Sequence, residues 1–158
     1  MFNIQAGIIM KHYIIDGNNL IGKIKSLQTI MHKDGQTARE KVVFMIENYF
    51  QGKQVKVSLC FDGYQKTVIR TVAAKIYYSD RQSADDQIKR LIEQACNPRT
   101  IILVSSDHNL MQFANVCRCE VISSEKFAGE LTHKKQSDSD DEKSNSISNA
   151  EIRKLFGV

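Results

Sequence analysis

The sequence predicts an α/β protein with three layers, α/β/α, around a central, mainly parallel sheet. Short β-rich runs alternate along the chain with segments whose apolar residues recur at helical spacing. One of these runs, Thr100–Val104, is almost continuously apolar, as expected of a strand covered by helices on both faces. Strands and helices that alternate in this way form parallel sheets flanked by helices.

The first third of the chain is expected to hold one strand and one helix. His12–Ile15 is a short β-rich run that ends in a turn-forming cluster, Asp16-Gly17-Asn18-Asn19. Thr37 and Glu40 have the spacing of a capping box, and apolar residues then recur at helical intervals as far as Phe50. This pattern predicts a helix of about four turns.

The middle of the chain adds a strand, an extended region and a helix. Val55–Phe61 is the second predicted strand. Thr67–Val72 and Lys75–Tyr78 have the composition of shorter strands or of an extended excursion, without a fixed place in the sheet. Ala84–Cys96 follows a capping serine, carries apolar residues at the helical period and ends before an Asn-Pro pair, which predicts a helix.

After the strand Thr100–Val104 we expect a short helix over residues 110–114, a last strand at Cys119–Ile122 and a core helix at Ser124–Leu131. The expected organisation is an extension at 1–9, one domain at 10–131, a polar flexible linker at 132–147 and a short C-terminal helix within 148–158.

Composition suits a globular protein with a polyanionic partner. Of 158 residues 42% are apolar, enough for one buried core. The net charge is +4, but residues 136–158 carry −2, so the remaining body carries +6. The four cysteines form no disulfide framework, and no apolar run is long enough to cross a bilayer. We therefore expect a cytoplasmic protein without a membrane partner.

Aspartates mark the ends of the predicted strands. Asp16, Asp62 and Asp107 each follow a strand, and Asp85 and Asp86 open a helix. Because the carboxyl ends of parallel strands meet at one edge of a sheet, these residues are expected to converge there. An aspartate after a strand is more often a turn former or a helix cap. Acidic residues in the first turn of a helix also stabilise that helix through its dipole. The coincidence of four segments is what favours a site.

Clustered carboxylates repel one another unless cations or protons neutralise them. Oxygen donors with little histidine favour Mg²⁺ or Mn²⁺, and one or two such ions support hydrolysis of a phosphodiester. The sequence contains neither the Gly-x-Ser-x-Gly pattern of serine hydrolases nor a Walker phosphate loop.

Four stretches carry a resemblance to a known family: Tyr13–Ile21, Leu59–Gly63, Ser83–Ile88 and Val104–Asp107. They resemble the YacP-like members of the NYN branch of the PIN-like nucleases, in the family's order. The resemblance implies a PIN-like fold, dependence on Mg²⁺ or Mn²⁺, endonucleolytic activity on RNA and a ribosome-associated role. Asn18 stands where many relatives have tyrosine, which leaves the subfamily open.

By motif position, the resemblance makes Asp16, Asp85 and Asp107 the principal metal ligands. Asp62 and Asp86 would add direct or water-mediated ligation, and Asp62 would join the catalytic set. Asn19 could orient Asp16 or the scissile phosphate.

Substrate contacts are expected from polar and basic residues around the acidic set. The hydroxyl of Ser106 could hold a ligand carboxylate, and His108 could contact a phosphate, although a surface role suits it equally. Tyr64 and Tyr77 could stack on bases or pack at the edge of the core. The expected substrate-binding residues are Asn18, Asn19, Ser106, His108, Lys23, Lys66, Arg70 and Arg81, with Lys25 and Arg39 as further candidate bases.

A metal-dependent endoribonuclease is the function these features favour. Two alternatives stay open: a non-catalytic RNA-binding module of the same fold, and a structure-specific DNA nuclease.

Overall fold

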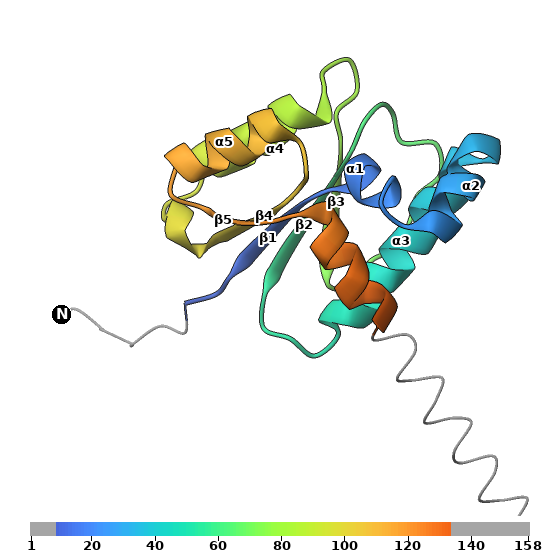
Figure 1. The fold of residues 1–158 in the computed structure, drawn as a ribbon, viewed down its shortest axis with the longest axis horizontal. Helices are drawn as coiled ribbons and strands as arrows, with labels where there is room; N and C mark the ends of the chain where they lie inside the picture. The colour runs from blue at the N-terminus through green and yellow to red at the C-terminus, as the bar shows by residue number, and fades with distance from the viewer. Residues whose placement is uncertain (1–8, 134–158) are drawn as a thin grey trace, which may run out of the picture.

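The computed structural model describes residues 9–133, so the expected extension, most of the linker and the C-terminal helix lie outside the described residues. Within that range all strands pair in parallel in one sheet of order β3-β2-β1-β4-β5 (Figure 1). The strands are β1 (His12–Asp16), β2 (Lys56–Phe61), β3 (Ala74–Tyr78), β4 (Ile101–Val104) and β5 (Glu120–Ile122).

Helices cover both faces of this sheet, which confirms the predicted three-layer architecture. In Figure 1, α4 and α5 lie on one face, and α1 to α3 lie on the other with the helix that follows β5. None of the described helices is long and apolar enough to cross a membrane. The helices are α1 (Gly17–Ile21), α2 (Lys25–Lys33), α3 (Gly35–Phe50), α4 (Ala84–Glu93), α5 (His108–Val116) and a helix at 124–133, with a 3-10 turn at Pro98–Thr100.

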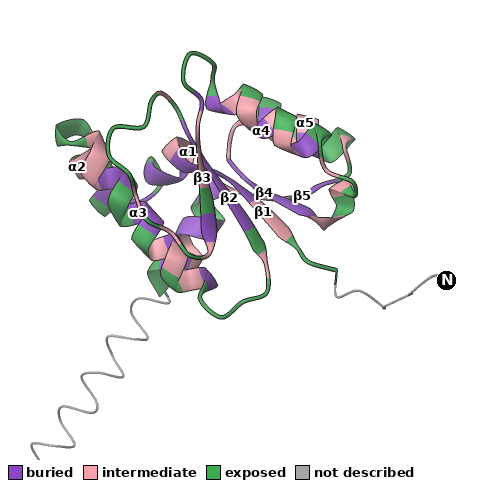
Figure 2. Cartoon of the chain, turned by 180° about the vertical axis from the view of Figure 1, so that it is seen from behind, coloured by how far each residue is buried: buried purple, intermediate pink, exposed green. Residues whose placement is uncertain are grey.

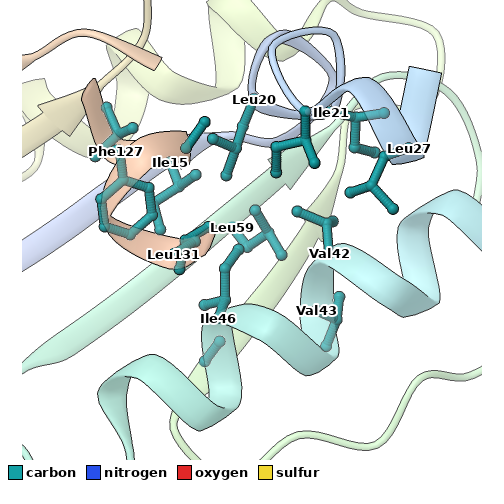
Figure 3. Close-up of a cluster of buried hydrophobic side chains, with 14 of the residues drawn as sticks. Ile15, Leu20, Ile21, Leu27, Val42, Val43, Ile46, Leu59, Phe127 and Leu131 are labelled. Atoms are coloured by element: carbon teal, nitrogen blue, oxygen red, sulfur yellow. The ribbon is translucent and has the colours of Figure 1, made fainter. Parts of the chain in front are cut away.

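Neighbouring residues of each strand enter two different cores. Ile15 packs toward α3, whereas Ile14 packs toward α4 and α5, as the alternation of side chains along a strand requires. The larger core joins Leu59 of β2 to Val42 of α3 and Phe127 of the last helix (Figure 3). Figure 2 shows the central strands largely buried between the two layers.

Two predictions about the first crossover differ from the structure. Helix α2 was not predicted, because Ile24 provides no side-chain cap and Leu27 is the helix's one buried residue. Helix α3 begins earlier than expected because Asp34 caps it, with Oδ1 accepting hydrogen bonds from the backbone N–H groups of Gln36 and Thr37 at 3.1 and 3.3 Å.

Of the two forms that the sequence allows before β3, residues 67–72 take the extended excursion and Lys75–Tyr78 the strand. Residues 67–72 form no strand: Val68 is 71% exposed and Val72 is 99% exposed. The carboxylate of Glu47 in α3 accepts hydrogen bonds from the backbone N–H groups of residues 72–74. This interaction holds the segment against the helix until it enters the sheet as β3.

The strand order places a switch point between β1 and β4. From β1 the chain adds β2 and β3 toward one edge, and it then returns to add β4 and β5 on the other side of β1. In open α/β sheets, ligands bind in the crevice beyond the carboxyl ends of the strands at such a point. The residues that follow β1 and β4 are therefore expected to line the ligand site.

Candidate active site

Asp16, the last residue of β1, is a buried carboxylate at this switch point. It is only 5% exposed, and its Oδ2 accepts a hydrogen bond from the hydroxyl of Ser105, just after β4, at 3.0 Å. Burial raises the pKa of Asp16 to about 6, against the lowering effect of the Ser105 hydrogen bond; the charges of Asp85 and Asp62 raise the pKa further. Among residues 9–133, no lysine or arginine forms an ion pair with it.

Gly17 lets this carboxylate lie close to the neighbouring strand. A Cβ atom at this position would lie 2.5 Å from the ring of Phe61 and 2.9 Å from the carbonyl oxygen of Cys60. Only glycine therefore fits between β1 and the end of β2 without moving backbone.

Asp62 follows β2 and fixes the start of helix α4. Its Oδ1 accepts a hydrogen bond from the backbone N–H of Ala84 at 2.8 Å. Asp85, the second residue of α4, is partly buried. Burial raises its pKa, and the charges of Asp107 and Asp62 add to the effect. Asp62 thus binds the first backbone N–H of α4, beside the capping residue Ser83, while contributing charge to the acidic cluster.

Asp107 connects the cluster to α5. It caps this helix, with Oδ1 accepting the N–H of Leu110 at 3.0 Å, and its own backbone N–H donates to the hydroxyl oxygen of Ser105 at 3.1 Å. Ser105 therefore bridges the residue that ends β1 and the residue that begins α5. Asp86 is exposed and acts on the cluster through its charge near Asp85.

The structure thus brings Asp16, Asp62, Asp85 and Asp107 to one edge of the sheet. Within residues 9–133, no three carboxylate, imidazole or thiol side chains lie close enough to hold a metal ion by themselves. Mg²⁺ is commonly held by one or two carboxylates, with water and substrate phosphates completing its shell. The donor chemistry, oxygen atoms without a neutralising base, fits Mg²⁺ or Mn²⁺ bound in that manner.

The two asparagines after β1 act as clamps between loops. Asn19 Oδ1 accepts hydrogen bonds from the backbone N–H of Ser106 at 3.0 Å and from the hydroxyl of Ser124 at 2.6 Å. Asn18 Oδ1 accepts from the backbone N–H of Asp62 at 3.3 Å. It is the backbone of Asn19, rather than its side-chain amide, that hydrogen bonds to Asp16.

The sequence suggested that Ser106 holds one of the site carboxylates. In the structure its neighbour Ser105 does so instead, by donating to Asp16. The hydroxyl of Ser106 donates to Glu125 and accepts the backbone N–H of Ser124 at 2.9 Å. Lys23, an expected phosphate contact, pairs with Glu125 at 3.1 Å. The hydrogen bond from Ser106, together with Lys23, lowers the pKa of Glu125 to about 2.

The other expected substrate contacts are exposed and come from three separate segments. Lys66 and Arg70 lie in the loop between β2 and β3, where Lys66 interacts electrostatically with Asp34 at the start of α3. Arg81 lies in the loop between β3 and α4, and His108 is exposed at the first residue of α5.

Arg39 has a structural position that its sequence context did not indicate. It is 8% exposed, its guanidinium donates to the backbone carbonyls of Asp62 and Tyr64, and it packs over the rings of Phe61 and Tyr78. It therefore supports the loop that carries Asp62, and it is not available as a surface contact for phosphate.

Two solved structures share the fold of this chain. A crystal structure of Rae1 (YacP) from Bacillus subtilis is 16% identical to this chain, with a TM-score of 0.69 over 94% of this chain and 88% of that chain. A crystal structure of a single-substitution mutant of that protein is 18% identical, with a TM-score of 0.68 over 81% of this chain and 79% of that chain. No curated protein matches.

These two likenesses show a shared fold. The family model of the YacP-like NYN domain matches residues 13–155, which include every aspartate of the acidic cluster. The chain therefore belongs to the YacP-like NYN domain family.

Proposed function

We propose that this chain is a Mg²⁺- or Mn²⁺-dependent endoribonuclease that hydrolyses RNA phosphodiester bonds. The observation that carries the proposal is the buried carboxylate of Asp16, which pairs with no base among residues 9–133 and whose neighbours Asp62 and Asp85 are also acidic. Such an arrangement is unfavourable in a protein without a counterion, because each charge raises the cost of the next. A bound divalent cation would offset that cost.

The residues that would hold one or two ions are Asp16, Asp85 and Asp107, with Asp62 and Asp86 acting directly or through water. An ion bound there would supply neutralisation of phosphate charge and activation of water for in-line attack. The chain itself contributes positioning: Ser105 orients Asp16, and helix starts fix Asp62 and Asp107. Metal sites work efficiently when hydrogen bonds from surrounding residues hold the metal-binding carboxylates in place.

RNA is the favoured substrate for two reasons. The family resemblance implies endonucleolytic activity on RNA, and the +6 charge of residues 1–135 favours binding to a polyanion. Association with the ribosome and a cytoplasmic location follow from the same resemblance and composition, and they stay predictions.

Cleavage of a labelled single-stranded RNA, with and without Mn²⁺, tests the proposal. We expect the wild-type protein to cut internally only with the metal, and Asp16→Asn and Asp85→Asn to lose cleavage while remaining folded. Glu93→Gln is the matched control, because it removes the same charge from the exposed far end of α4.

Undiminished cleavage by both aspartate variants would contradict the proposal. A DNA strand of the same sequence separates the two nuclease alternatives, because faster cutting of DNA would favour a DNA nuclease. Salt-sensitive RNA binding without any cleavage would favour the non-catalytic RNA-binding module.

A further inference from the structure

A hollow lies beside the acidic cluster, beyond the carboxyl ends of β2 and β3. Its wall comes from three segments: the loop after β2, the loop after β3 and the first turns of α4. The side chains that give it its chemistry are those of Tyr64, Arg81, Gln82, Gln87 and Arg90. The proposed hydrolysis uses none of them directly.

Hydrogen bonds between its two loops form this hollow in advance of any ligand. The backbone N–H of Gly63 donates to the hydroxyl of Ser79 at 3.0 Å, and the N–H of Asp80 donates to the carbonyl of Gly63 at 2.9 Å. Gly63 has a φ of +85°, which favours glycine, and the buried Arg39 donates to the carbonyl of Tyr64 at 3.2 Å. A preformed wall lowers the entropic cost of binding.

The side chains in the hollow match the parts of a nucleotide. Tyr64 is 57% exposed, so its ring is available for stacking on a base. Arg81 is exposed and forms no ion pair or hydrogen bond with another described residue, which leaves its guanidinium available for phosphate. The amide of Gln87 offers both a donor and an acceptor to a base edge. Asp80 is the one carboxylate in the wall, against two guanidinium groups.

The position of the hollow connects it to the site of hydrolysis. Tyr64 follows Asp62 by two residues in one loop, and the wall residues Gln87 and Arg90 belong to α4, the helix whose first turn carries Asp85. The Asp62 carboxylate is itself hydrogen bonded to the start of α4. One strand of nucleic acid could therefore occupy the hollow with one nucleotide and present a neighbouring phosphate to the carboxylates.

We propose that this hollow binds a nucleotide of single-stranded RNA next to the scissile phosphate, with Tyr64 stacking on the base and Arg81 contacting the backbone. This inference rests on the proposed function, which it deepens by naming the form of the substrate. A base can reach the ring of Tyr64 only when it is free of its own stack and pairing partner. The protein should therefore prefer single strands to duplexes.

Binding of a fluorescein-labelled single-stranded RNA, measured by anisotropy without divalent metal in the Asp16→Asn background, tests the inference. We expect Tyr64→Ala to weaken binding about tenfold and Tyr64→Phe to retain it, because phenylalanine keeps the stacking face. Arg81→Ala should also weaken binding and reduce its salt dependence. Arg99→Ala is the matched control, since Arg99 is exposed just before β4 at the opposite end of the sheet.

Duplex RNA of the same sequence should bind more weakly and be insensitive to Tyr64→Ala. Unchanged affinity of Tyr64→Ala for the single strand, or an equal loss with Arg99→Ala and Arg81→Ala, would overturn the inference. The two proposals fail separately. Binding that depends on Tyr64 without any Mn²⁺-dependent cleavage by the wild type would remove the nuclease and leave the nucleotide site. Cleavage with Tyr64-independent binding would remove only the nucleotide site.

Discussion

The two ends of the sheet differ in how they accommodate buried ionisable side chains. At the carboxyl end, Asp16 is buried beside other carboxylates, and no lysine or arginine of the described residues pairs with it. At the amino end of the same strand, burial, together with the charge of Lys56, lowers the pKa of His12 to about 4, so the ring is neutral near pH 7. The ring's Nε2 lies 2.8 Å from the hydroxyl oxygen of Ser58.

The amino end therefore avoids unpaired buried charge, whereas the carboxyl end concentrates it. Lys11, also at the amino end, pairs with Glu120 at 3.8 Å. Stability alone would remove or pair the charge of Asp16 as well. This difference between the ends is what the proposed cation site requires, and changes at each end should test it.

The tight approach that holds Asp16 against β2 gives the largest expected effect on stability. Gly17→Ala should destabilise the protein by about 3 kcal/mol, because both the Phe61 ring and the Cys60 backbone must move. Urea unfolding measures the change. Gly129→Ala is the matched control: no atom lies within 4 Å of its added Cβ, so in its helix the substitution should stabilise by about 0.5–1 kcal/mol. Equal effects at both glycines would show that the carboxyl end is not tightly packed.

Neutralising the buried carboxylate should stabilise the protein. In EDTA, Asp16→Asn should raise the free energy of unfolding by about 1–3 kcal/mol, because the amide oxygen can still accept from Ser105 and no charge is buried. At the amino end, Glu120→Gln should change it by less than about 0.5 kcal/mol, because its ion pair is exposed. A destabilised Asp16→Asn variant would argue against stored electrostatic cost at the site.

Ser105 is a positioning residue that sequence reasoning did not identify. Ser105→Ala should reduce Mn²⁺-dependent cleavage about 10- to 100-fold by removing the hydroxyl that joins Asp16 to the Asp107 backbone. The readout that separates positioning from folding is the Mn²⁺ concentration needed for half-maximal rate, which should rise, and Ser105→Thr should restore part of it. A lower rate at an unchanged metal requirement would contradict this role.

The smallest effect concerns pH at the amino end. Because the pKa of His12 is lower in the folded protein than the ordinary histidine value of 6.5, the unfolded chain binds the proton more tightly. Stability should therefore fall as pH drops from about 6.5 toward 4, by about 1 kcal/mol or less because the ring is partly exposed. His12→Gln should lose this component in urea titrations at several pH values, with no change in cleavage. An identical pH profile in the variant would exclude His12 as the source.

Local patterns were enough to predict the strands and the aspartates that follow them. Asp16 directly follows an apolar run and Asp107 follows another after two serines, and a parallel sheet brings such positions to one edge. The family model confirms the family that these patterns suggested, and the structure confirms the α/β/α layers. Helix α2 escaped prediction because no capping side chain marks its start, although its residues Leu27, Ile30 and Met31 pack against the larger core.

The interactions that orient the carboxylates depend on contacts far apart in the chain. Ser105 reaches Asp16 because β1 and β4 pair with Ile15 opposite Val104, which brings the next residue of each strand together. A single sequence contains no such register. For the same reason the clamp between Asn19 and Ser124 could not be seen, and Ser106 was assigned the role that belongs to Ser105.

The proposed function requires the carboxylates at the carboxyl end of the sheet, which pair with no base among residues 9–133, to bind a divalent cation. The most direct measurement is the rise in thermal unfolding temperature on titration with Mn²⁺, because a ligand that binds only the folded state stabilises it. We expect a saturable rise for the wild type and for Glu93→Gln, and little or none for Asp16→Asn and Asp107→Asn. Asparagine at position 107 can still cap α5. An equal rise in all four proteins, or no rise in the wild type, would contradict it.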